Sequence, residues 1–540
     1  MILRRTSLSL TAFFAFALLL SPACKRSDNR VTTGDHTQTL HLGNLTEPSD
    51  LDPQIISQIN DSQIVLGLIE GLTAMDPKDA HPIPGVAESW EVSPDKLTWT
   101  FQLRKTARWS NGDPVTAGDF VYSYQRILSP NLGSEYASLL YCLSGAEAFG
   151  TGKLTDFAQV GVRALNDHTL ALTLRTPLAY LPALVMHAAW APVHRATIEK
   201  FGRMDERGTR WTRAENYVGN GPFNLAAWEP NQVVRLLKST TYWDRDAVRL
   251  SEVNFYPIED RVTEEASFRA GQLHITGTLP PDKIDTYKRE QPQFLRQEAT
   301  FASSFIFYNT SKPPLNDPRV RRALALVIDR NALCEKILRG GRTPAYTLTP
   351  PGIAGYDAVP GFKEDIAEAR RLLAEAGFKD GVGFPRLELL TAKGGTSQFP
   401  EAMQQMWRTQ LGVDIAIVLQ EGRVFLDSLR TRSFDLAPSG WVGDYLDPST
   451  FLDLFKTGNG NNHTGWTSVA YDRLINDALA ARDDAMRYPL YHQAEQLLMD
   501  EMPIAPLVYG RRNYLARQSV KGWEPNVLDL HPLKGVYLLP

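Results

Sequence analysis

The chain has 540 residues, with 57 lysines and arginines against 61 aspartates and glutamates and a formal net charge of −4. A chain of this length exceeds what one hydrophobic core usually serves, so we expect two or more domains. The near balance of charges, without a run of basic residues, argues against nucleic acid as a partner.

The first 24 residues have the layout of a secretory signal. Arg4 and Arg5 precede an uncharged run over residues 6–20, which is shorter than the roughly 20 apolar residues of a membrane-spanning helix. The run leads into Leu20-Ser21-Pro22-Ala23-Cys24, which resembles a bacterial lipobox, although lipoboxes usually carry leucine at the second position. The resemblance implies that Cys24 is acylated and becomes a lipid anchor; a plain signal peptide or an uncleaved anchor is the alternative. Residues 25–39 are polar and predict a flexible tether.

The first recognisable elements follow the tether. Residues 97–103 alternate apolar and polar side chains, which predicts a half-buried strand. A turn over residues 110–114 follows. Thr116, with Asp119 three residues later, is predicted to cap a helix.

Two further helices are predicted in the second half of the chain. One begins with Asp317 as its cap and ends near residues 340–341, and the other covers residues 366–376 and stops at Gly377. Strands and helices mixed in this way over about 500 residues indicate an α/β protein of several lobes.

Signatures of catalysis, metal binding and cofactor binding are missing from the sequence. Zinc-protease, serine-hydrolase, phosphate-loop and paired-cysteine motifs do not occur, and the 10 histidines do not stand at ligand spacings. We therefore expect no enzyme, no metal and no cofactor. Apart from Cys24 the chain has Cys142 and Cys334, for which one disulfide is possible but two unpaired buried thiols are favoured. The 11 Trp, 19 Tyr and 23 Phe supply rings of the kind that line binding surfaces, although most rings belong to cores.

A series of short motifs resembles the oligopeptide-binding proteins of bacterial ABC importers, in order and at natural spacing from about Leu40 to Pro540. The motifs are Pro84-Gly85-Val86-Ala87-Glu88-Ser89-Trp90, residues 97–104, Trp109-Ser110-Asn111-Gly112, residues 119–123, Asn220-Gly221-Pro222-Phe223, residues 312–317, residues 373–377 and Ser439-Gly440-Trp441. The resemblance implies the α/β periplasmic-binding-protein fold, in which two lobes joined by two crossover strands close on the ligand and an additional domain is inserted in the first lobe.

The resemblance also implies domain boundaries for this chain. Crossovers are expected near Thr300 and Gly510. The first lobe would take residues 40–68, 197–300 and 511–540, the inserted domain residues 69–196, and the second lobe residues 301–510.

In this family an aspartate three residues after a tryptophan pairs with the α-amine of the peptide. Here these positions are Trp441 and Asp444, so Asp444 is the expected ammonium partner. Backbone groups from Gly440 to Val442 would pair with the ligand main chain, and Trp441 would form a pocket wall. Tyr136 and Tyr509 stand where relatives contact the peptide. A helix cap or surface salt bridge is the alternative for Asp444, and ordinary packing is the alternative for the others.

Two departures leave the ligand's length and its C-terminal recognition open. Ser57 stands where relatives carry a ligand-contacting glutamate, and Pro438 stands where one relative has an arginine for the peptide carboxylate. Arg430 and Arg432 are nearby candidates to replace that cation.

The resemblance implies a monomeric lipoprotein at the periplasm or outer face of the cell envelope, with peptide ligands and ABC permease subunits as partners. Relatives of the same fold bind nickel chelates, glutathione, cell-wall peptides or oligosaccharides. A peptide-sensing receptor or a chaperone is a further alternative. Asp444 favours a ligand with a free amine over a neutral sugar.

Overall fold

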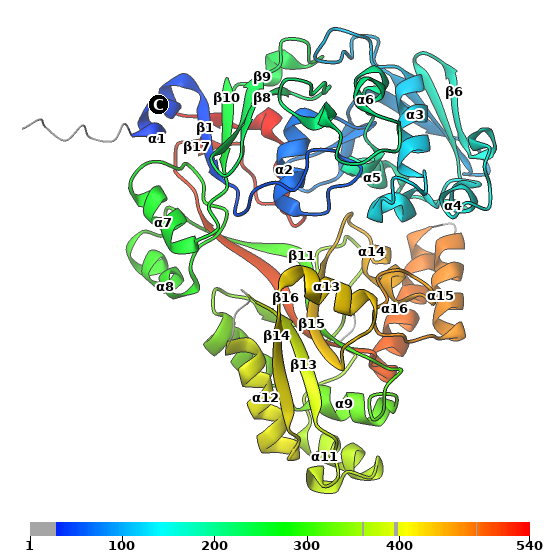
Figure 1. The fold of residues 1–540 in the computed structure, drawn as a ribbon, viewed down its shortest axis with the longest axis vertical. Coiled ribbons are helices and arrows are strands. Elements are labelled where there is room, and N and C mark those ends of the chain that lie inside the picture. Colours follow the sequence, from blue (N-terminus) through cyan, green and yellow to red (C-terminus); the bar gives the residue numbers. More distant parts are fainter. Residues whose placement is uncertain (1–28, 359–360, 394–397, 482) are drawn as a thin grey trace, which may run out of the picture.

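The structure is a computed structural model that describes residues 29–358, 361–393, 398–481 and 483–540. The predicted signal sequence and Cys24 lie outside this part of the chain. Figure 1 shows the predicted two-lobed α/β architecture, in which the strands β11 (Leu295–Tyr308) and β16 (Ile504–Leu515) run from one lobe into the other. Among the described residues, no helix has the length and apolar character needed to span a bilayer.

The first lobe is built on two sheets with the strand orders β1-β10-β9-β8 and β4-β5-β7-β6. β1 is parallel to β10, and the other pairs are antiparallel. In β5 the side chains of Trp99, Phe101 and Leu103 are buried, which confirms the predicted alternation. The strands are β1 (Thr39–Gly43), β4 (Ala87–Val92), β5 (Thr98–Leu103), β6 (Val162–Asn166), β7 (Thr169–Thr173), β8 (Phe223–Glu229), β9 (Val233–Lys238) and β10 (Glu252–Tyr256).

Helices pack on the sheets of the first lobe. The predicted cap is confirmed at α3, because the Thr116 backbone N–H donates to the Asp119 carboxylate at 2.8 Å. The main helices are α2 (Ile59–Leu68), α3 (Ala117–Ile127), α6 (Arg195–Phe201), α7 (Arg261–Arg269) and α8 (Pro281–Glu290).

The prediction of an unstructured tether is wrong for residues 30–39, which form helix α1 (Arg30–Thr37) and the first residue of β1. The Gln38 side chain exchanges hydrogen bonds with the backbone of Leu538, donating at 2.7 Å and accepting at 3.1 Å. Val31 is buried. Tertiary contacts with the C-terminal tail thus order a segment whose own composition does not favour structure.

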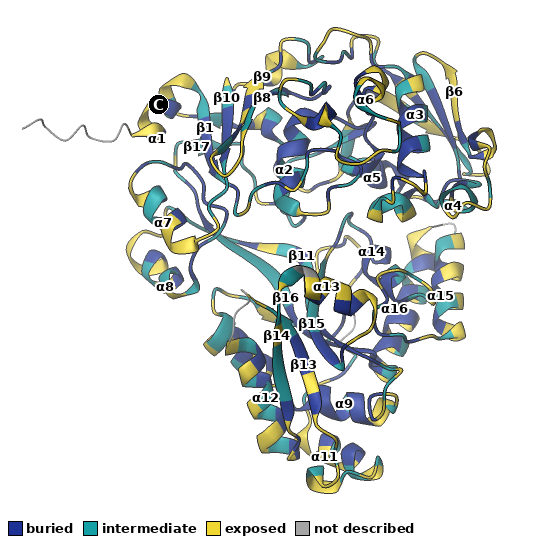
Figure 2. Cartoon of the chain, in the orientation of Figure 1, coloured by how far each residue is buried: buried dark blue, intermediate teal, exposed yellow. Residues whose placement is uncertain are grey.

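The second lobe contains a mixed sheet with the strand order β12-β16-β11-β15-β13-β14. Figure 2 shows buried residues inside each lobe. The main core cluster of the second lobe also includes Met75 and Ala80 of the first. The remaining strands are β12 (Thr343–Pro344), β13 (Leu387–Ala392), β14 (Ile415–Gln420) and β15 (Leu436–Val442). Its main helices are α9 (Pro318–Leu326), α11 (Ile366–Glu375), α12 (Gln398–Leu411), α13 (Gly422–Arg430), α15 (Val469–Ala480) and α16 (Asp484–Glu501).

The predicted helix after Asp317 is shorter than expected. α9 begins at the predicted cap but ends at Leu326, and two separate turns, α10 (Arg330–Ala332) and η6 (Leu333–Leu338), cover the rest. Asp329 causes the break, because its side chain accepts the Ala332 backbone N–H at 2.8 Å and starts a new helix. The helix over residues 366–376 agrees with α11, which stops before Gly377 at a φ of 95°.

β11 and β16 pair antiparallel in two stretches. The pairing is interrupted between Ala299 and Ser303. At the first-lobe end, Ile275 bridges Leu42 of β1 to Ala516, the residue after β16. A side chain at Gly510 would meet Cβ of Ala302 at 2.7 Å, so the strands approach closely at the interruption. We propose this point as the hinge between the lobes, where the sequence analysis places the crossovers.

Candidate functional site

Asp444 lies in a loop that follows β15 and carries its side chain against the first lobe. The Tyr136 hydroxyl donates to Asp444 Oδ1 at 3.3 Å, and Nε2 of His187 lies 3.9 Å from the same oxygen. Tyr136 belongs to the 3-10 turn η1 (Glu135–Leu140), and His187 caps η3 (Ala188–Trp190). Within the second lobe, the Asp444 backbone N–H donates to Thr450 Oγ1 at 3.1 Å. The carboxylate is therefore held at the contact between the lobes.

The surroundings of Asp444 are buried and electrically neutral. Its side chain is 11% exposed, and burial raises its pKa to about 7. Burial lowers the pKa of His187 to about 4, and His187 Nδ1 accepts the Ala189 N–H at 3.2 Å, so a neutral ring carries its proton on Nε2. Among the described residues, no lysine or arginine forms an ion pair with Asp444. Ionisation of a buried carboxylate that has only neutral partners costs free energy, and a bound cation would lower that cost.

The residues after Asp444 dock on the first lobe. Tyr445 is buried within the core cluster of that lobe, and its ring stacks on Tyr180 with centroids 5.3 Å apart. Ser449 Oγ donates to the Tyr180 hydroxyl at 3.1 Å. Asp447 and Arg487, both buried, form an ion pair that holds the loop from within the second lobe. The lobes thus touch around Asp444, and the structure represents a closed arrangement.

One edge of β15 has hydrogen-bonding groups available for a ligand. The Gly443 N–H donates to the carbonyl of Phe301 in β11 at 2.7 Å. The direction of backbone hydrogen bonds alternates along a strand. The backbone N–H and C=O of Trp441 therefore also face β11, whereas those of Gly440 and Val442 face the opposite edge of β15. Within the described part of the chain, β13 pairs with β15 only at Leu436, so this edge is open beyond that point.

Trp441 and Tyr509, both predicted to contact the ligand, share one face of the second-lobe sheet. Each is paired with Ser303, Trp441 from β15 and Tyr509 from β16. Trp441 Nε1 donates to Thr450 Oγ1 at 3.4 Å, and the Tyr509 hydroxyl donates to the Thr347 carbonyl at 3.2 Å. Side chains alternate along a strand, so Val442 points to the other face.

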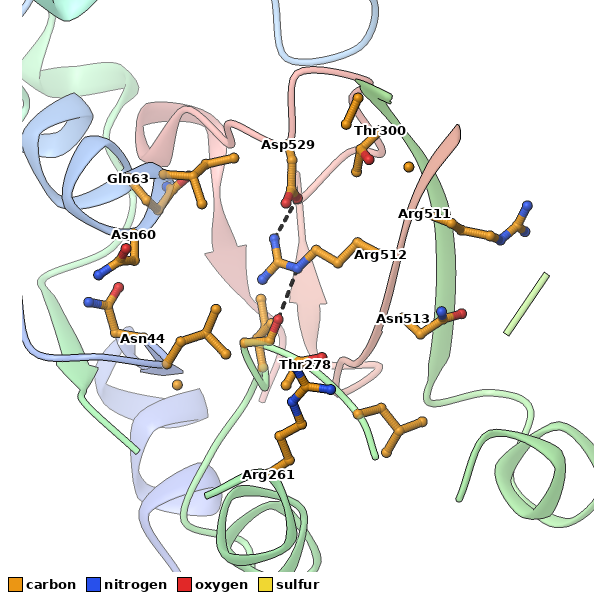
Figure 3. A pocket seen from close by; sticks show the side chains of 18 of the residues that line it. Asn44, Asn60, Gln63, Arg261, Thr278, Thr300, Arg511, Arg512, Asn513 and Asp529 are labelled. Carbon is orange, nitrogen blue, oxygen red and sulfur yellow. Dashed lines mark hydrogen bonds and ion pairs between the residues drawn. The ribbon is translucent and has the colours of Figure 1, made fainter. Parts of the chain in front are cut away.

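A cavity of about 390 Å³ lies on the Val442 side, between the two lobes and the crossing strands (Figure 3). Its lining includes three residues of α2, Ile59, Asn60 and Gln63, whereas Ser57, two residues before α2, is exposed and does not line it. Four arginines and one aspartate supply its charged groups: Arg261, Arg342, Arg511, Arg512 and Asp529.

The cations of this cavity are not those suggested by the sequence. Arg430 is exposed and pairs with Asp427 at 3.0 Å, and neither it nor Arg432 lines the cavity. Arg261 and Arg342 are 81 positions apart and belong to no motif. No signal in the sequence brings them together, and the same holds for His187 beside Asp444.

Cysteines and possible metal ligands lie elsewhere. Cys142 and Cys334 are unpaired, and burial raises the pKa of the Cys142 thiol to about 12. In the described part of the chain, two groups have donor atoms close enough to hold an ion, Asp76 with Asp79 and His81, and Glu298 with Asp529 and His531. In the second group Arg512 already pairs with Asp529 at 2.6 Å, and its positive charge opposes a bound cation.

Comparison with known proteins finds relatives over most of the chain. The family model described as bacterial extracellular solute-binding proteins, family 5 middle, matches residues 81–463. The periplasmic oligopeptide-binding protein OppA of Escherichia coli K12 is 36% identical over 511 residues, which is 93% of this chain and 91% of OppA. The structure of Haemophilus influenzae OppA in complex with RPPGFSPFR has a TM-score of 0.84 at 31% identity, covering 93% of this chain and 99% of the other.

A second solved structure tests the arrangement of the lobes. The unliganded open form of the murein tripeptide-binding protein MppA has a TM-score of 0.73 at 33% identity, covering 93% of this chain and 97% of the other. Because sequence identity is slightly higher for this pair, sequence distance does not explain the lower score. The chain resembles the peptide complex more than the open form, in agreement with the contacts around Asp444.

Proposed function

The chain belongs to the bacterial extracellular solute-binding proteins of family 5, and on this basis we propose that it binds short peptides between its lobes and delivers them to the permease of an ABC importer. It would act as a binding protein without catalysis, metal or cofactor. The names of its relatives support a peptide ligand, since they include OppA and a complex with RPPGFSPFR.

Asp444 carries the proposal. A carboxylate that is buried and paired only with neutral groups is a poor structural residue, because ionisation there is unfavourable without a cation. The α-ammonium group of a peptide supplies that cation when the lobes close. Charge-assisted hydrogen bonds of this kind are shorter and stronger than neutral ones.

The open edge of β15 would bind the main chain of the peptide. A peptide with its amine at Asp444 is placed to run along Gly440 and Val442 as an added strand. Main-chain pairing is independent of side chains, so many peptide sequences fit the same site. Trp441 and Tyr509 would shape the walls on one face, and Ser57 would leave space where relatives have a longer side chain.

Closure of the two lobes would connect peptide binding to delivery to the permease. Tyr136 and His187 approach Asp444 only when the first lobe lies against the second, so a ligand at Asp444 favours the closed form. We propose that the permease recognises this form. Cys24 would hold the receptor at the outer face of the membrane, six residues before the first residue of α1.

A thermal-shift panel on protein lacking residues 1–24 tests this proposal. Di- to hexapeptides with a free amine are expected to raise the melting temperature, and N-acetylated versions are not. Free amino acids, oligosaccharides, glutathione and nickel serve as competing ligand classes. Stabilisation by sugars or nickel alone would refute the peptide assignment.

Two variants test whether stabilisation by free-amine peptides depends on Asp444. Asp444→Asn removes the charge but keeps an oxygen for the Tyr136 hydroxyl, and it is expected to abolish stabilisation by free-amine peptides. Glu495→Gln is the matched control, because Glu495 is also buried with a raised pKa but binds Thr349 and Tyr356 inside the second lobe. Equal stabilisation of both variants by free-amine peptides would remove Asp444 from the site.

A further inference from the structure

The Thr450 hydroxyl lies where the expected ammonium partner and the expected pocket wall meet. Thr450 is the second residue of the short helix α14 (Ser449–Leu452), at the edge of the second lobe next to the first (Figure 1), and it is 5% exposed. Its Oγ1 accepts the backbone N–H of Asp444 at 3.1 Å and the indole N–H of Trp441 at 3.4 Å. One buried oxygen thus links both residues.

The hydrogen-bonding capacity of this hydroxyl determines where its own proton points. A hydroxyl has two acceptor lone pairs and one O–H donor. Both lone pairs of Thr450 receive N–H groups, so only the proton is left, and a buried polar group is nearly always hydrogen-bonded. Burial raises the pKa of Asp444, and hydrogen bonds from the side chains of Tyr136 and Thr450 lower it in part. The Thr450 proton is therefore donated to the Asp444 carboxylate.

The bonds to Thr450 belong to the second lobe alone. The two residues that follow Thr450 are buried in the main core cluster of that lobe. The other groups that face the Asp444 carboxylate, the Tyr136 hydroxyl and the His187 ring, come from the first lobe. When the lobes separate, Asp444 loses these two partners and keeps Thr450. A side chain that is oriented before its ligand arrives loses less conformational freedom on binding.

The start of α14 is also fixed from within the second lobe. The Asp447 carboxylate accepts the Ser449 backbone N–H at 3.0 Å, and the Asp447 carbonyl accepts the Thr450 N–H at 3.3 Å. Asp447 is itself paired with the buried Arg487. The Thr450 hydroxyl therefore stands on a rigid turn, and it cannot rotate away without breaking the bonds from Asp444 and Trp441.

We propose that Thr450 is a positioning residue of the ligand site, whose hydroxyl holds the Asp444 carboxylate and the Trp441 ring in the orientation that receives an α-ammonium group before the lobes close. This inference rests on the proposed role of Asp444 in peptide binding. The hydroxyl acts through Asp444 and Trp441 and need not touch the peptide. Because it donates to the carboxylate, it also favours the ionised form that pairs with a cation.

Calorimetry with the tripeptide Ala-Ala-Ala tests the hydroxyl. Thr450→Val replaces it by a methyl group of similar size and is expected to raise Kd by about 10- to 100-fold, since a hydrogen bond to a charged group is lost. Thr450→Ser keeps the hydroxyl and should bind almost as tightly as the wild type. Wild-type affinity in the valine variant, or an equal loss in the serine variant, overturns the proposal.

Thr464→Val is the matched control. Thr464 is a buried threonine of the same lobe, and its hydroxyl donates to Asn462 Oδ1 at 2.6 Å and accepts the Trp466 N–H at 3.0 Å. This variant also loses a buried hydroxyl, but its bonds do not reach Asp444 or Trp441. Its affinity for Ala-Ala-Ala should stay at the wild-type level. A loss equal to that of Thr450→Val would indicate a general structural effect and contradict the positioning role.

The pH profile of binding gives a readout that a merely structural role would not move. Without the Thr450 proton the ionised carboxylate is less favoured, so the pKa of Asp444 should rise further. Binding requires the ionised form, so the loss of affinity on acidification should begin at a higher pH in Thr450→Val than in the wild type. Thr450→Ser should restore the wild-type profile. An equal loss of affinity at every pH from 5 to 8 contradicts donation to Asp444.

Hydrogen exchange in the ligand-free wild type tests the orientation without any substitution. The indole N–H of Trp441 and the backbone N–H of Asp444 should exchange slowly, because Thr450 holds both of them whether the lobes are open or closed. Exchange of both groups at the rate of an unprotected N–H contradicts an orientation that precedes the ligand.

An acetylated peptide separates failure of this inference from failure of the proposed function. If N-acetyl-Ala-Ala-Ala binds the wild type as tightly as Ala-Ala-Ala, the proposed role of Asp444 fails, and the inference about Thr450 fails with it. If acetylation weakens binding to the wild type but Thr450→Val binds Ala-Ala-Ala normally, Asp444 keeps its role and only the inference about Thr450 is overturned.

Discussion

The ring of Tyr445 in the second lobe stacks on the ring of Tyr180 in the first, with centroids 5.3 Å apart and planes inclined by 11°. Both residues are outside the open edge of β15, so this contact joins the lobes without any ligand. It lies directly beside Asp444 in sequence. Closure is therefore stabilised by protein contacts as well as by whatever occupies the cleft.

Replacing Tyr445 by alanine should weaken peptide binding because the closed form loses this stack. A stacked aromatic pair contributes about 0.5–1.5 kcal/mol beyond its buried area, so we expect at least roughly a tenfold increase in Kd when the buried area is included. Calorimetry measures the effect. Tyr445→Phe keeps the ring and loses only the hydroxyl contact with Ser449 at 3.1 Å, and should bind almost normally. Unchanged affinity in the alanine variant would show that the stack does not contribute to closure.

Peptide affinity should depend on pH in a way set by Asp444. Its pKa in the closed, ligand-free structure is about 7, whereas binding an ammonium group requires the ionised form. Below pH 7 a proton must leave before the peptide binds, so Kd should rise by up to about tenfold for each pH unit. Above about pH 8 the α-amine of the peptide loses its own charge. Titration calorimetry from pH 5 to 9 should therefore show a maximum in affinity near pH 7 to 8, and a flat profile below pH 7 contradicts this assignment.

The same carboxylate should lower the stability of the empty protein at neutral and alkaline pH. The folded state holds the Asp444 proton up to a pKa of about 7, whereas the unfolded chain releases it near 3.8. The folded state binds more protons between these values, so its stability falls as the pH rises through them. Asp444→Asn should then raise the free energy of unfolding by roughly 1–4 kcal/mol at pH 8 and by little at pH 4. Chemical denaturation at the two pH values checks the difference, and an equal effect of Asp444→Asn at pH 4 and pH 8 contradicts the raised pKa of Asp444.

Backbone methylation of the peptide tests pairing with the edge of β15. A strand added there has every second residue directed toward Gly440 and Val442. N-methylation at those positions removes a donor and should reduce affinity by about 0.5–1.5 kcal/mol, which is about two- to tenfold. Methylation at the intervening positions should cost much less. Equal losses at all positions would mean that the peptide does not bind as a strand.

Local patterns predict part of this protein well. The strand over residues 97–103 and the caps at Thr116 and Asp317 depend on neighbours in sequence, and all are present in the structure. A short motif with Trp441 singles out Asp444, and its role in the ligand site stays a prediction. Its first-lobe partner His187 has no such signal, since the two residues are 257 positions apart and meet only when the lobes close.

The errors have the same physical origin. Helix α1 forms in a polar segment because Gln38 and Val31 find partners far away in the chain. Arg261 and Arg342 carry no local signature, and only the folded chain shows that they share one cavity. Which residues come to share one cavity is a property of the assembled lobes, which periodicity in the sequence does not encode.

If the peptide pairs with the open edge of β15 as we propose, that edge also determines which physical state of a polypeptide the receptor accepts. An edge of this kind binds only a chain whose own N–H and C=O groups are unpaired. Helices, hairpins and folded domains have already paired theirs, and they do not compete for Gly440 and Val442. The receptor therefore distinguishes disordered fragments from intact proteins before any side chain is read.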